Sequence, residues 1–459
     1  MVTVKKGITK ANKYTKKRGR LIHNNNNNNN TKILHNFYKD LFKSNKDLAL
    51  QLTLERNINA QFLEYIYKQL NAKQLIINAI AIAKSRTSEE NKSIIVNKIT
   101  SIVNKHLRSS KYIDSELINF ILTNTNSKIV TYKNIIKGKT YIFDFIMYND
   151  EISILNLDLI VEKMLLVLQL IIAISNNESR NGQHVTFFLT PFQKKLNLNN
   201  NAILGAKNVN SGFTYPNLIN GLTFIYRKEE FFKVFIHESI HYYGIDKALH
   251  KDFSNDAKYN INYNKFINSF NISPQYIADI GINEGLTEYW TFIIYLIAQS
   301  YKKSIALATF IYEFENSYKL ELLHIIFQVI KILNYNKLTY SEFLTKSSNK
   351  YKETSHIFSY YIVKTLLVYN HADLLKSAMF NINFSSSSSL NIALKSDPNS
   401  INTFFIKLLS YASDSRFINI INKVTTYISN YSKTNARSIY KQKIILSNLM
   451  MMYNDNNII

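Results

Sequence analysis

The sequence predicts a mainly α-helical protein with a small mixed β-sheet, an α+β fold. Apolar residues recur at three- and four-residue intervals through residues 37–123 and again through 275–455, as in amphipathic helices. Between Lys128 and Tyr148 the pattern changes to alternating β-branched and aromatic residues, which is typical of strands. The chain has 459 residues, 46% of them hydrophobic, so it can build a substantial core and two or more domains.

Residues 1–35 are expected to form a disordered basic tail. They contain lysines and arginines but no acidic residue before Asp40, and they include seven consecutive asparagines, Asn24–Asn30, which cannot build a core. The run KKRGR at 16–20 could serve as a nuclear import signal or a phosphate-contacting arm, but such short basic runs are more often part of an ordinary solvated tail. The asparagine tract is typical of proteins from very AT-rich genomes, including those of large DNA viruses.

We expect three folded regions after the tail. These are an N-terminal helical domain at 36–125, a mixed core at 126–300 and a C-terminal helical domain at 301–459. The five serines Ser385–Ser389 predict a loop in the last region.

The central region holds the predicted sheet. Two strands, KIVTY and TYIFDFIMY, are expected on either side of Lys137-Gly138, and a long buried helix is expected around Leu155–Asn176. Further strands are expected at His184–Thr190, before Pro191, and at Leu222–Arg227. The segment Asn208–Asn217 is interpreted as a surface loop with a Gly turn, or alternatively as an extended segment beside a cleft.

Cysteine content and hydropathy limit the cellular locations that are expected for the protein. There is no cysteine, so disulfides and thiolate ligands are excluded, and an intracellular location (cytoplasm, nucleus or virion) is expected. The apolar run Met164–Ile174 is too short to cross a bilayer, and no apolar segment of a signal peptide follows the basic N-terminus. The net charge of +24 favours nucleic acid or acidic partners, contacted through the tail.

The stretch FFKVFIHESIHYYGID, residues 231–246, contains two of only ten histidines. In a helix, His237 and His241 project from one face a single turn apart and can hold one metal ion. Glu238 lies about 100° around the helix from His237, close enough to reach a water on that metal without being a ligand. The alternative is a pair of structural histidines packed beside a carboxylate.

A hydrolytic zinc site usually has three protein ligands, so a third must lie elsewhere. The pattern HExxHxxGxxH would place it shortly after Gly244, but Lys247 occupies that position, and a protonated ammonium cannot bind zinc. Asp246 is one residue early for this role, and His250 is three residues late.

A better third ligand is Glu284 in the stretch NEGLTEYW, residues 283–290. Glu288 follows one helical turn later on the same face. Glu284 is therefore the predicted ligand, and Glu288 is predicted to accept the free ring N–H of a ligating histidine. Read without HESIH, the same pair of carboxylates would be an ordinary solvated helix face.

The combination of HESIH with NEGLTE resembles the signature of the gluzincin zinc metallopeptidases over roughly residues 222–298. The spacer between His241 and Glu284 is longer than in thermolysin-like members, and the exopeptidase signature GxMxN is missing. The resemblance implies a zincin-like core flanked by helical regions, a bound Zn²⁺ and endopeptidase activity on protein or peptide substrates.

The resemblance also implies catalytic roles for side chains of this chain. Glu238 would be the general base for a zinc-activated water, and a downstream Tyr or His would stabilise the oxyanion. The candidates for the oxyanion role are His356, Tyr360 and Tyr361. The two tyrosines point to different helix faces, so at least one of them is expected to be a core residue.

Two other functions stay open at this stage. A basic, Asn-rich structural or nucleic-acid-associated protein would explain the net charge and the tail without chemistry. A catalytically inactive metallopeptidase-like protein would explain the motif as well.

Overall fold

A computed structural model describes most of the folded chain. The described residues are 32–453 except 53–55, 75–76, 78, 125, 149–152, 176, 178–179, 198–201, 216–220, 254, 346–348, 383–389 and 435–444. The predicted basic run, the asparagine tract and the serine loop lie outside the described residues. Residues 32–44 are helical, so a helix begins inside the stretch expected to be tail.

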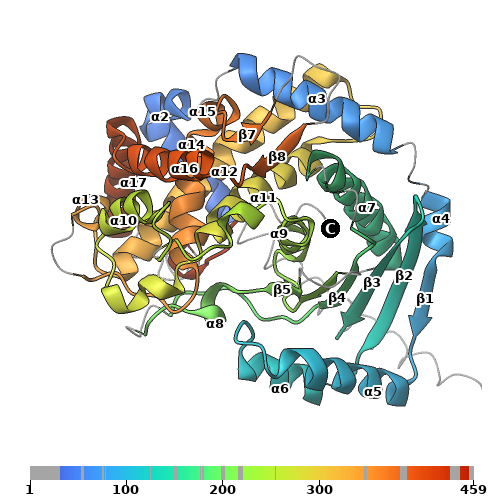
Figure 1. The fold of residues 1–459 in the computed structure, drawn as a ribbon. Coiled ribbons are helices and arrows are strands. Elements are labelled where there is room, and N and C mark those ends of the chain that lie inside the picture. Colours follow the sequence, from blue (N-terminus) through green and yellow to red (C-terminus); the bar gives the residue numbers. More distant parts are fainter. Residues whose placement is uncertain are drawn as a thin grey trace, which may run out of the picture.

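A six-stranded mixed sheet forms one side of the molecule, in the order β1-β2-β3-β4-β6-β5 (Figure 1). β3 runs parallel to β4, and β4 runs parallel to β6, whereas the other neighbouring pairs are antiparallel. β5 is therefore an edge strand antiparallel to β6. The strands are β1 (Arg86–Glu89), β2 (Lys128–Ile136), β3 (Lys139–Met147), β4 (His184–Phe188), β5 (Gly212–Tyr215) and β6 (Leu222–Ile225).

Helices cover both faces of this sheet (Figure 1). On one face α7 (Ile154–Ser175) and α9 (Phe231–Tyr243) pack through aromatic contacts such as Phe143 with Phe235 and Phe187 with Phe231. On the other face α5 (Lys92–Ile102) and α6 (Ser115–Thr123) close a separate apolar cluster with β2, β3 and β4. α9 is thus held between the sheet and the helical part of the protein.

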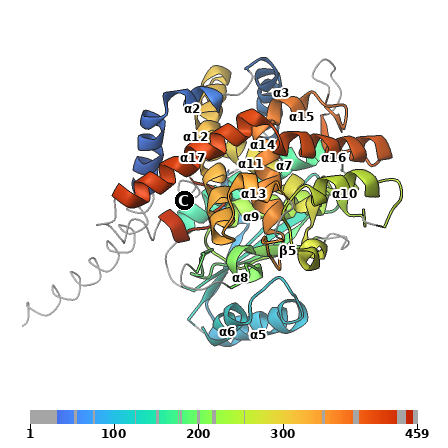
Figure 2. The ribbon, with the colours of Figure 1, turned by 90° about the vertical axis from the view of Figure 1, so that its left-hand side faces the viewer.

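The helical part contains the N-terminal helices and most of the chain after α9 (Figure 2). A long central helix, α12, packs against α11, α14 and α17. The helices are α2 (Lys46–Gln51), α3 (Arg56–Gln74), α4 (Ala79–Lys84), α8 (Ala206–Val209), α10 (Asn260–Asn268), α11 (Ile282–Ser300), α12 (Leu307–Tyr335), α13 (Tyr340–Phe343), α14 (Lys364–Tyr369), α15 (His371–Leu375), α16 (Pro398–Ala412) and α17 (Ser415–Thr434).

Short elements complete the fold. Two π-helical turns are η1 (Val103–Leu107) and η4 (Phe358–Val363), and η2 (Lys247–Leu249) and η3 (Pro274–Asp279) are 3₁₀ turns. A two-stranded sheet joins β7 (Phe380–Asn381) to β8 (Asn391–Leu394).

The predicted fold class is confirmed at the level of a mainly helical protein with a small mixed sheet. Four strands lie where none was expected: β1 falls in the region predicted to be helical, β5 falls in the stretch interpreted first as a surface loop, and β7 and β8 fall in the predicted C-terminal helical domain. Each has at most four residues, too few to show alternation above the surrounding pattern. The main apolar cluster draws residues from Leu34 to Tyr453, so all three predicted regions share one core.

Within the described residues, no helix is long and apolar enough to span a membrane. The helix containing the apolar run Met164–Ile174 is α7, which packs against α3, α4 and α9 instead.

Candidate metal centre

The helix α9 carries the HESIH residues, and all thirteen of its residues are buried. Its aromatic side chains face the sheet and α11, as Phe235 against Phe143 and Phe232 against Tyr295 show. The helix ends at Gly244, whose φ of 71° is left-handed and whose N–H donates to the Ile240 and His241 carbonyls. This C-terminal turn redirects the chain immediately after His241.

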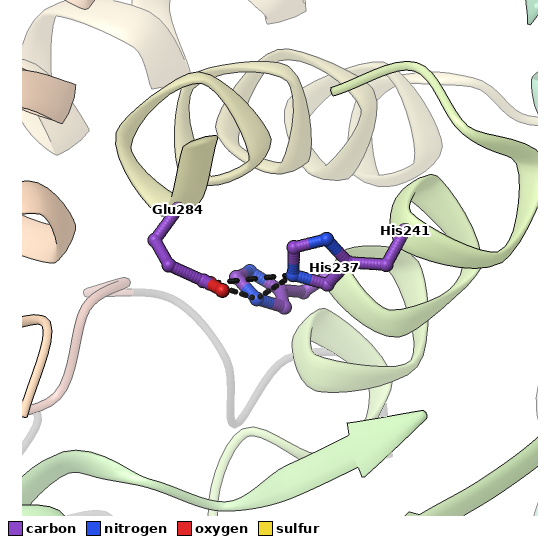
Figure 3. A group of neighbouring side chains, drawn as sticks. All are labelled: His237, His241 and Glu284. Atoms are coloured by element: carbon purple, nitrogen blue, oxygen red, sulfur yellow. Dashed lines mark hydrogen bonds and ion pairs between the residues drawn. The ribbon is translucent and has the colours of Figure 1, made fainter. Parts of the chain in front are cut away.

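The helix α11 supplies the third predicted ligand. Gly281 precedes it, and Glu284 lies in its first turn. α9 and α11 are packed neighbours, and Figure 3 shows the Glu284 side chain reaching from its own helix toward the two imidazoles on α9. The two stretches that the sequence separates widely are therefore adjacent in the fold.

His237, His241 and Glu284 converge on one point. The two Nε2 atoms are 3.0 Å apart, and Oε2 of Glu284 lies 3.1 Å from Nε2 of His237 and 3.2 Å from Nε2 of His241. Zinc bonds of about 2.0–2.2 Å at tetrahedral angles separate ligand atoms by roughly 3.3–3.5 Å. The observed triangle is therefore close to the size that a bound zinc ion requires.

Each histidine meets a carboxylate at its other ring nitrogen. Nδ1 of His237 lies 2.8 Å from Oε1 of Glu288, an ion-pair distance, although the direction does not meet hydrogen-bond geometry. Nδ1 of His241 lies 2.7 Å from Oδ2 of Asp246. A proton on each Nδ1 leaves both Nε2 lone pairs pointing at each other and at a carboxylate, an arrangement that a cation stabilises.

Asp246 is a site residue that the sequence interpretation missed. It is fully buried, and its Oδ2 also contacts His250, whose side chain is 40% exposed, and Nδ2 of Asn283 at 3.4 Å. Sequence reasoning considered Asp246 and His250 only as third ligands after HESIH. Gly244 is the sequence feature that could have predicted this position. A glycine in the left-handed conformation at a helix end turns the following residues back toward the last helical turn.

The same residues form a second group that could hold a metal, made by His241, Asp246 and His250. It shares His241 with the first group but uses the opposite ring nitrogen. Since Asp246 already occupies Nδ1 of His241, we interpret this group as the support that orients His241.

Charges around the centre shift the pKa values of its members. Burial alone would lower the pKa of His237 and of His241, but the neighbouring carboxylates raise both above the usual histidine value. Burial alone would raise the pKa of Glu284 and of Asp246, and the histidines lower both. The negative charge that favours imidazolium here also favours a bound dication.

Glu238 occupies the position expected of a general base. It follows His237 directly, is only 4% exposed and contacts neither imidazole as a ligand. Burial raises the pKa of Glu238 to about 7, with the two histidines opposing that rise. A carboxylate with such a pKa can accept and release a proton near neutral pH.

The three oxyanion candidates lie in different places. Tyr360 lines the cavity beside His237 and Glu238, with its ring 6.0 Å from the His237 ring. His356 accepts the Gly281 N–H at its Nδ1 and so supports the start of α11. Tyr361 donates to the Leu449 carbonyl at 2.6 Å and is a buried structural residue. Of the three, Tyr360 lines the cavity that adjoins His237 and Glu238.

Buried lysines hold Glu288 in place. Lys233 of α9 and Lys364 of α14 both form ion pairs with this carboxylate, and all three side chains are buried. Burial alone would raise the pKa of Glu288, but the two lysines and His237 lower it well below its usual value. Glu288 is therefore a fixed anion next to Nδ1 of His237.

Comparison with protein-family models, with curated proteins and with solved structures gives no match. The resemblance to gluzincins therefore rests on the motif residues themselves.

Proposed function

We propose that this protein is a zinc-dependent metallopeptidase of the gluzincin type, with a zincin-like core, acting as an endopeptidase. One observation carries the proposal. Two imidazoles from α9 and one carboxylate from α11 meet at distances of 3.0–3.2 Å beside the carboxylate of Glu238. This combination gives three metal ligands and an adjacent base that is not a ligand.

The donor set favours zinc among common divalent ions. Two nitrogens and one oxygen form the three-ligand set found in catalytic zinc sites, which leaves a fourth position for water or substrate. When bound, the metal would supply Lewis acidity that polarises a peptide carbonyl and activates water. Glu288 and Asp246 would hold the two imidazoles with their Nε2 lone pairs on the metal.

The chain's own residues would move the proton and stabilise charge. Glu238 would accept the proton of the attacking water and pass it to the leaving amine. Burial and the neighbouring carboxylates raise the pKa of Tyr360 well above its usual value. Its hydroxyl therefore keeps its proton and can donate to a developing oxyanion.

The edge strand β5 suits an extended peptide substrate. It ends the sheet next to β6 and packs against α9. A Cβ at Gly212 would lie 3.2 Å from Oε1 of Glu238, so the strand backbone passes close to the base. A peptide pairing with this edge would be held by its backbone rather than by a chain end, which favours cleavage of internal bonds.

The test is metal content and hydrolysis measured on the same preparation. We expect about one zinc per chain by mass spectrometry, and cleavage of denatured protein substrates. Glu238→Gln should reduce kcat by at least ~10²-fold while zinc content stays unchanged. Glu64→Gln, at an exposed ion pair on α3, is the matched control and should keep activity.

Two results would contradict the proposal. A zinc-free protein would remove the chemistry altogether. A zinc-loaded protein without peptidase activity would favour the catalytically inactive alternative.

Composition is the basis for the cellular location and the partners that we propose. We propose an intracellular protein of the cytoplasm, nucleus or virion whose basic N-terminal residues contact nucleic acid or an acidic partner. Loss of nucleic-acid binding on removal of residues 1–31, with peptidase activity retained, would support this division of roles.

A further inference from the structure

A small cavity adjoins the metal centre on the Glu238 side. Its volume is about 20 Å³, and its lining includes His237, Glu238, Tyr360, Val234 and Met451. The cavity touches both a proposed metal ligand and the proposed base, so it adjoins the position that a scissile carbonyl would occupy at the centre. The cavity is therefore a position at which the protein could select the substrate residue beside the scissile bond.

The cavity holds very little. About 10–15 Å³ of such space is needed for one water molecule, so there is room for one water or for a side chain of one or two non-hydrogen atoms. A hydrogen, a methyl or a hydroxymethyl side chain fits this space. A branched or aromatic side chain does not fit unless a wall moves.

One wall of the cavity is formed by β5, which packs directly against α9. A Cβ placed at Gly212 would meet Cγ1 of Val234 at 2.9 Å and the Phe224 carbonyl oxygen at 3.0 Å. β5 and α9 are thus packed as closely as a glycine permits. Moving either element would disturb the sheet.

Met451 forms another part of the lining and belongs to the C-terminal segment, residues 445–453. The Met451 side chain is 2% exposed, and its Sδ lies 3.1 Å from Nζ of Lys233. The N–H groups of Met451 and Met452 both donate to Oε1 of the buried Glu230, at 2.7 and 2.8 Å. This anchor fixes Met451 beside the centre.

Further hydrogen bonds fix the rest of the C-terminal segment. His324 contacts the Met450 carbonyl at 2.9 Å, Lys331 donates to the Ile445 carbonyl at 3.2 Å, and Tyr361 donates to the Leu449 carbonyl. The donors lie on α12 and η4, so the segment is bound to the helical part over its length. Charged and buried partners of this kind are expensive to leave unpaired, so the segment holds its position when substrate binds.

One polar group in the lining has no partner. Oγ of Ser211 is buried and makes no hydrogen bond within the described structure. Ser211 lines the cavity next to Gly212. A hydroxyl entering the cavity would find a hydrogen-bond partner there.

We propose that this cavity is the subsite for a residue next to the scissile bond and that it accepts glycine, alanine or serine. Met451 and Val234 set the size limit, and Ser211 favours the hydroxyl. This inference rests on the proposed peptidase function, and it names the class of peptide bond that is cleaved.

The test compares cleavage of a mixed peptide library by the wild type, Met451→Ala and Met451→Leu. The wild type should prefer alanine over leucine at one position flanking the cut by at least ~10-fold in kcat/KM, read from mass spectra of the products. Met451→Ala should reduce this preference about tenfold or more, and the similar-sized Met451→Leu should retain it. Val234→Ala enlarges the cavity from α9 and should act in the same direction if Met451→Ala fails to fold.

A binding series tests the cavity without hydrolysis. Zinc-binding phosphonate peptides carrying alanine or leucine at each position flanking the phosphorus are titrated into zinc-loaded Glu238→Gln protein by calorimetry. We expect at least ~10-fold weaker binding of leucine at one position, and a smaller difference in the Met451→Ala, Glu238→Gln double variant.

The outcomes separate the two proposals. Cleavage or binding that ignores side-chain size overturns the subsite and leaves the peptidase standing. Size-selective binding without any hydrolysis supports the subsite and contradicts the peptidase. Failure to bind any phosphonate overturns both.

Discussion

His237 and His241 in α9 are buried like His324 in α12 and His371 in α15, yet the two pairs have opposite surroundings. The α9 pair faces Glu284, Glu288 and Asp246, which raise the pKa of both imidazoles. The other pair faces tyrosine hydroxyls, Tyr38 at His324 and Tyr289 at His371, each 2.7 Å from Nδ1.

Burial without a carboxylate has the opposite effect on the second pair. It lowers the pKa of His324 and of His371 to about 3, so these imidazoles stay neutral. The difference shows that burial alone does not identify a metal ligand. Converging negative charge is what distinguishes the α9 pair, and it would compensate a cation taken out of water.

The largest effect should come from removing a converging carboxylate. Glu284→Ala should lower zinc affinity by more than about 100-fold, since it removes the proposed carboxylate ligand and leaves the two imidazoles facing each other. His371→Gln should leave zinc affinity unchanged. Competition with a fluorescent zinc chelator measures both variants, and equal losses in both would contradict the comparison.

A smaller effect is expected from the carboxylate that only orients a ligand. Asp246→Asn should weaken zinc binding about 10–100-fold, because the neutral amide holds the Nδ1 proton of His241 less strongly. The matched control is Asp252→Asn, an exposed carboxylate on the same connection, for which no change is expected. The same competition assay applies, and unchanged affinity in Asp246→Asn would exclude the orienting role.

The smallest effect concerns stability at acid pH. His371 has a folded pKa of about 3, below the unfolded value of about 6.5, so the unfolded chain binds the extra proton as pH falls. Its contribution to stability is therefore present above about pH 6.5 and is lost progressively below it. Between pH 6 and pH 5 the loss should be roughly 1 kcal/mol for this one histidine.

His371→Gln removes that loss, while the exposed His35→Gln does not. Urea unfolding at the two pH values measures the difference for each variant. If the wild type and His371→Gln lose stability equally, His371 is not buried as a neutral imidazole.

Much of the candidate metal centre can be predicted from the sequence because its residues lie on helices. The four-residue spacing of His237 and His241, and of Glu284 and Glu288, fixes which side chains share a face before any tertiary contact is known. The long helix α7 and the strands β2 and β3 are visible because their apolar patterns are long or strongly alternating, whereas β4 and β6 are marked by the breaks at Pro191 and at Asn220-Gly221.

The missed features depend on contacts between distant parts of the chain. Asp246 reaches His241 only through the turn at Gly244, and β5 becomes a strand by pairing with β6. The C-terminal segment falls in the stretch predicted to be helical, but only residues 445–447 of it are helical, and its position is set by contacts with Glu230, Lys331 and His324. A pattern along the chain does not encode these partners.

The C-terminal segment has a consequence for how the protein matures. A ribosome that has completed α9 and α11 has not yet made residues 445–453, so Glu230 has no backbone donors from Met451 and Met452 at that stage. Lys194 can pair with Oε2 of Glu230 at that stage, but Oε1 of this buried acid lacks the two N–H donors that it has in the folded protein. The region around Glu230 therefore reaches its final structure only after residues 445–453 have been made.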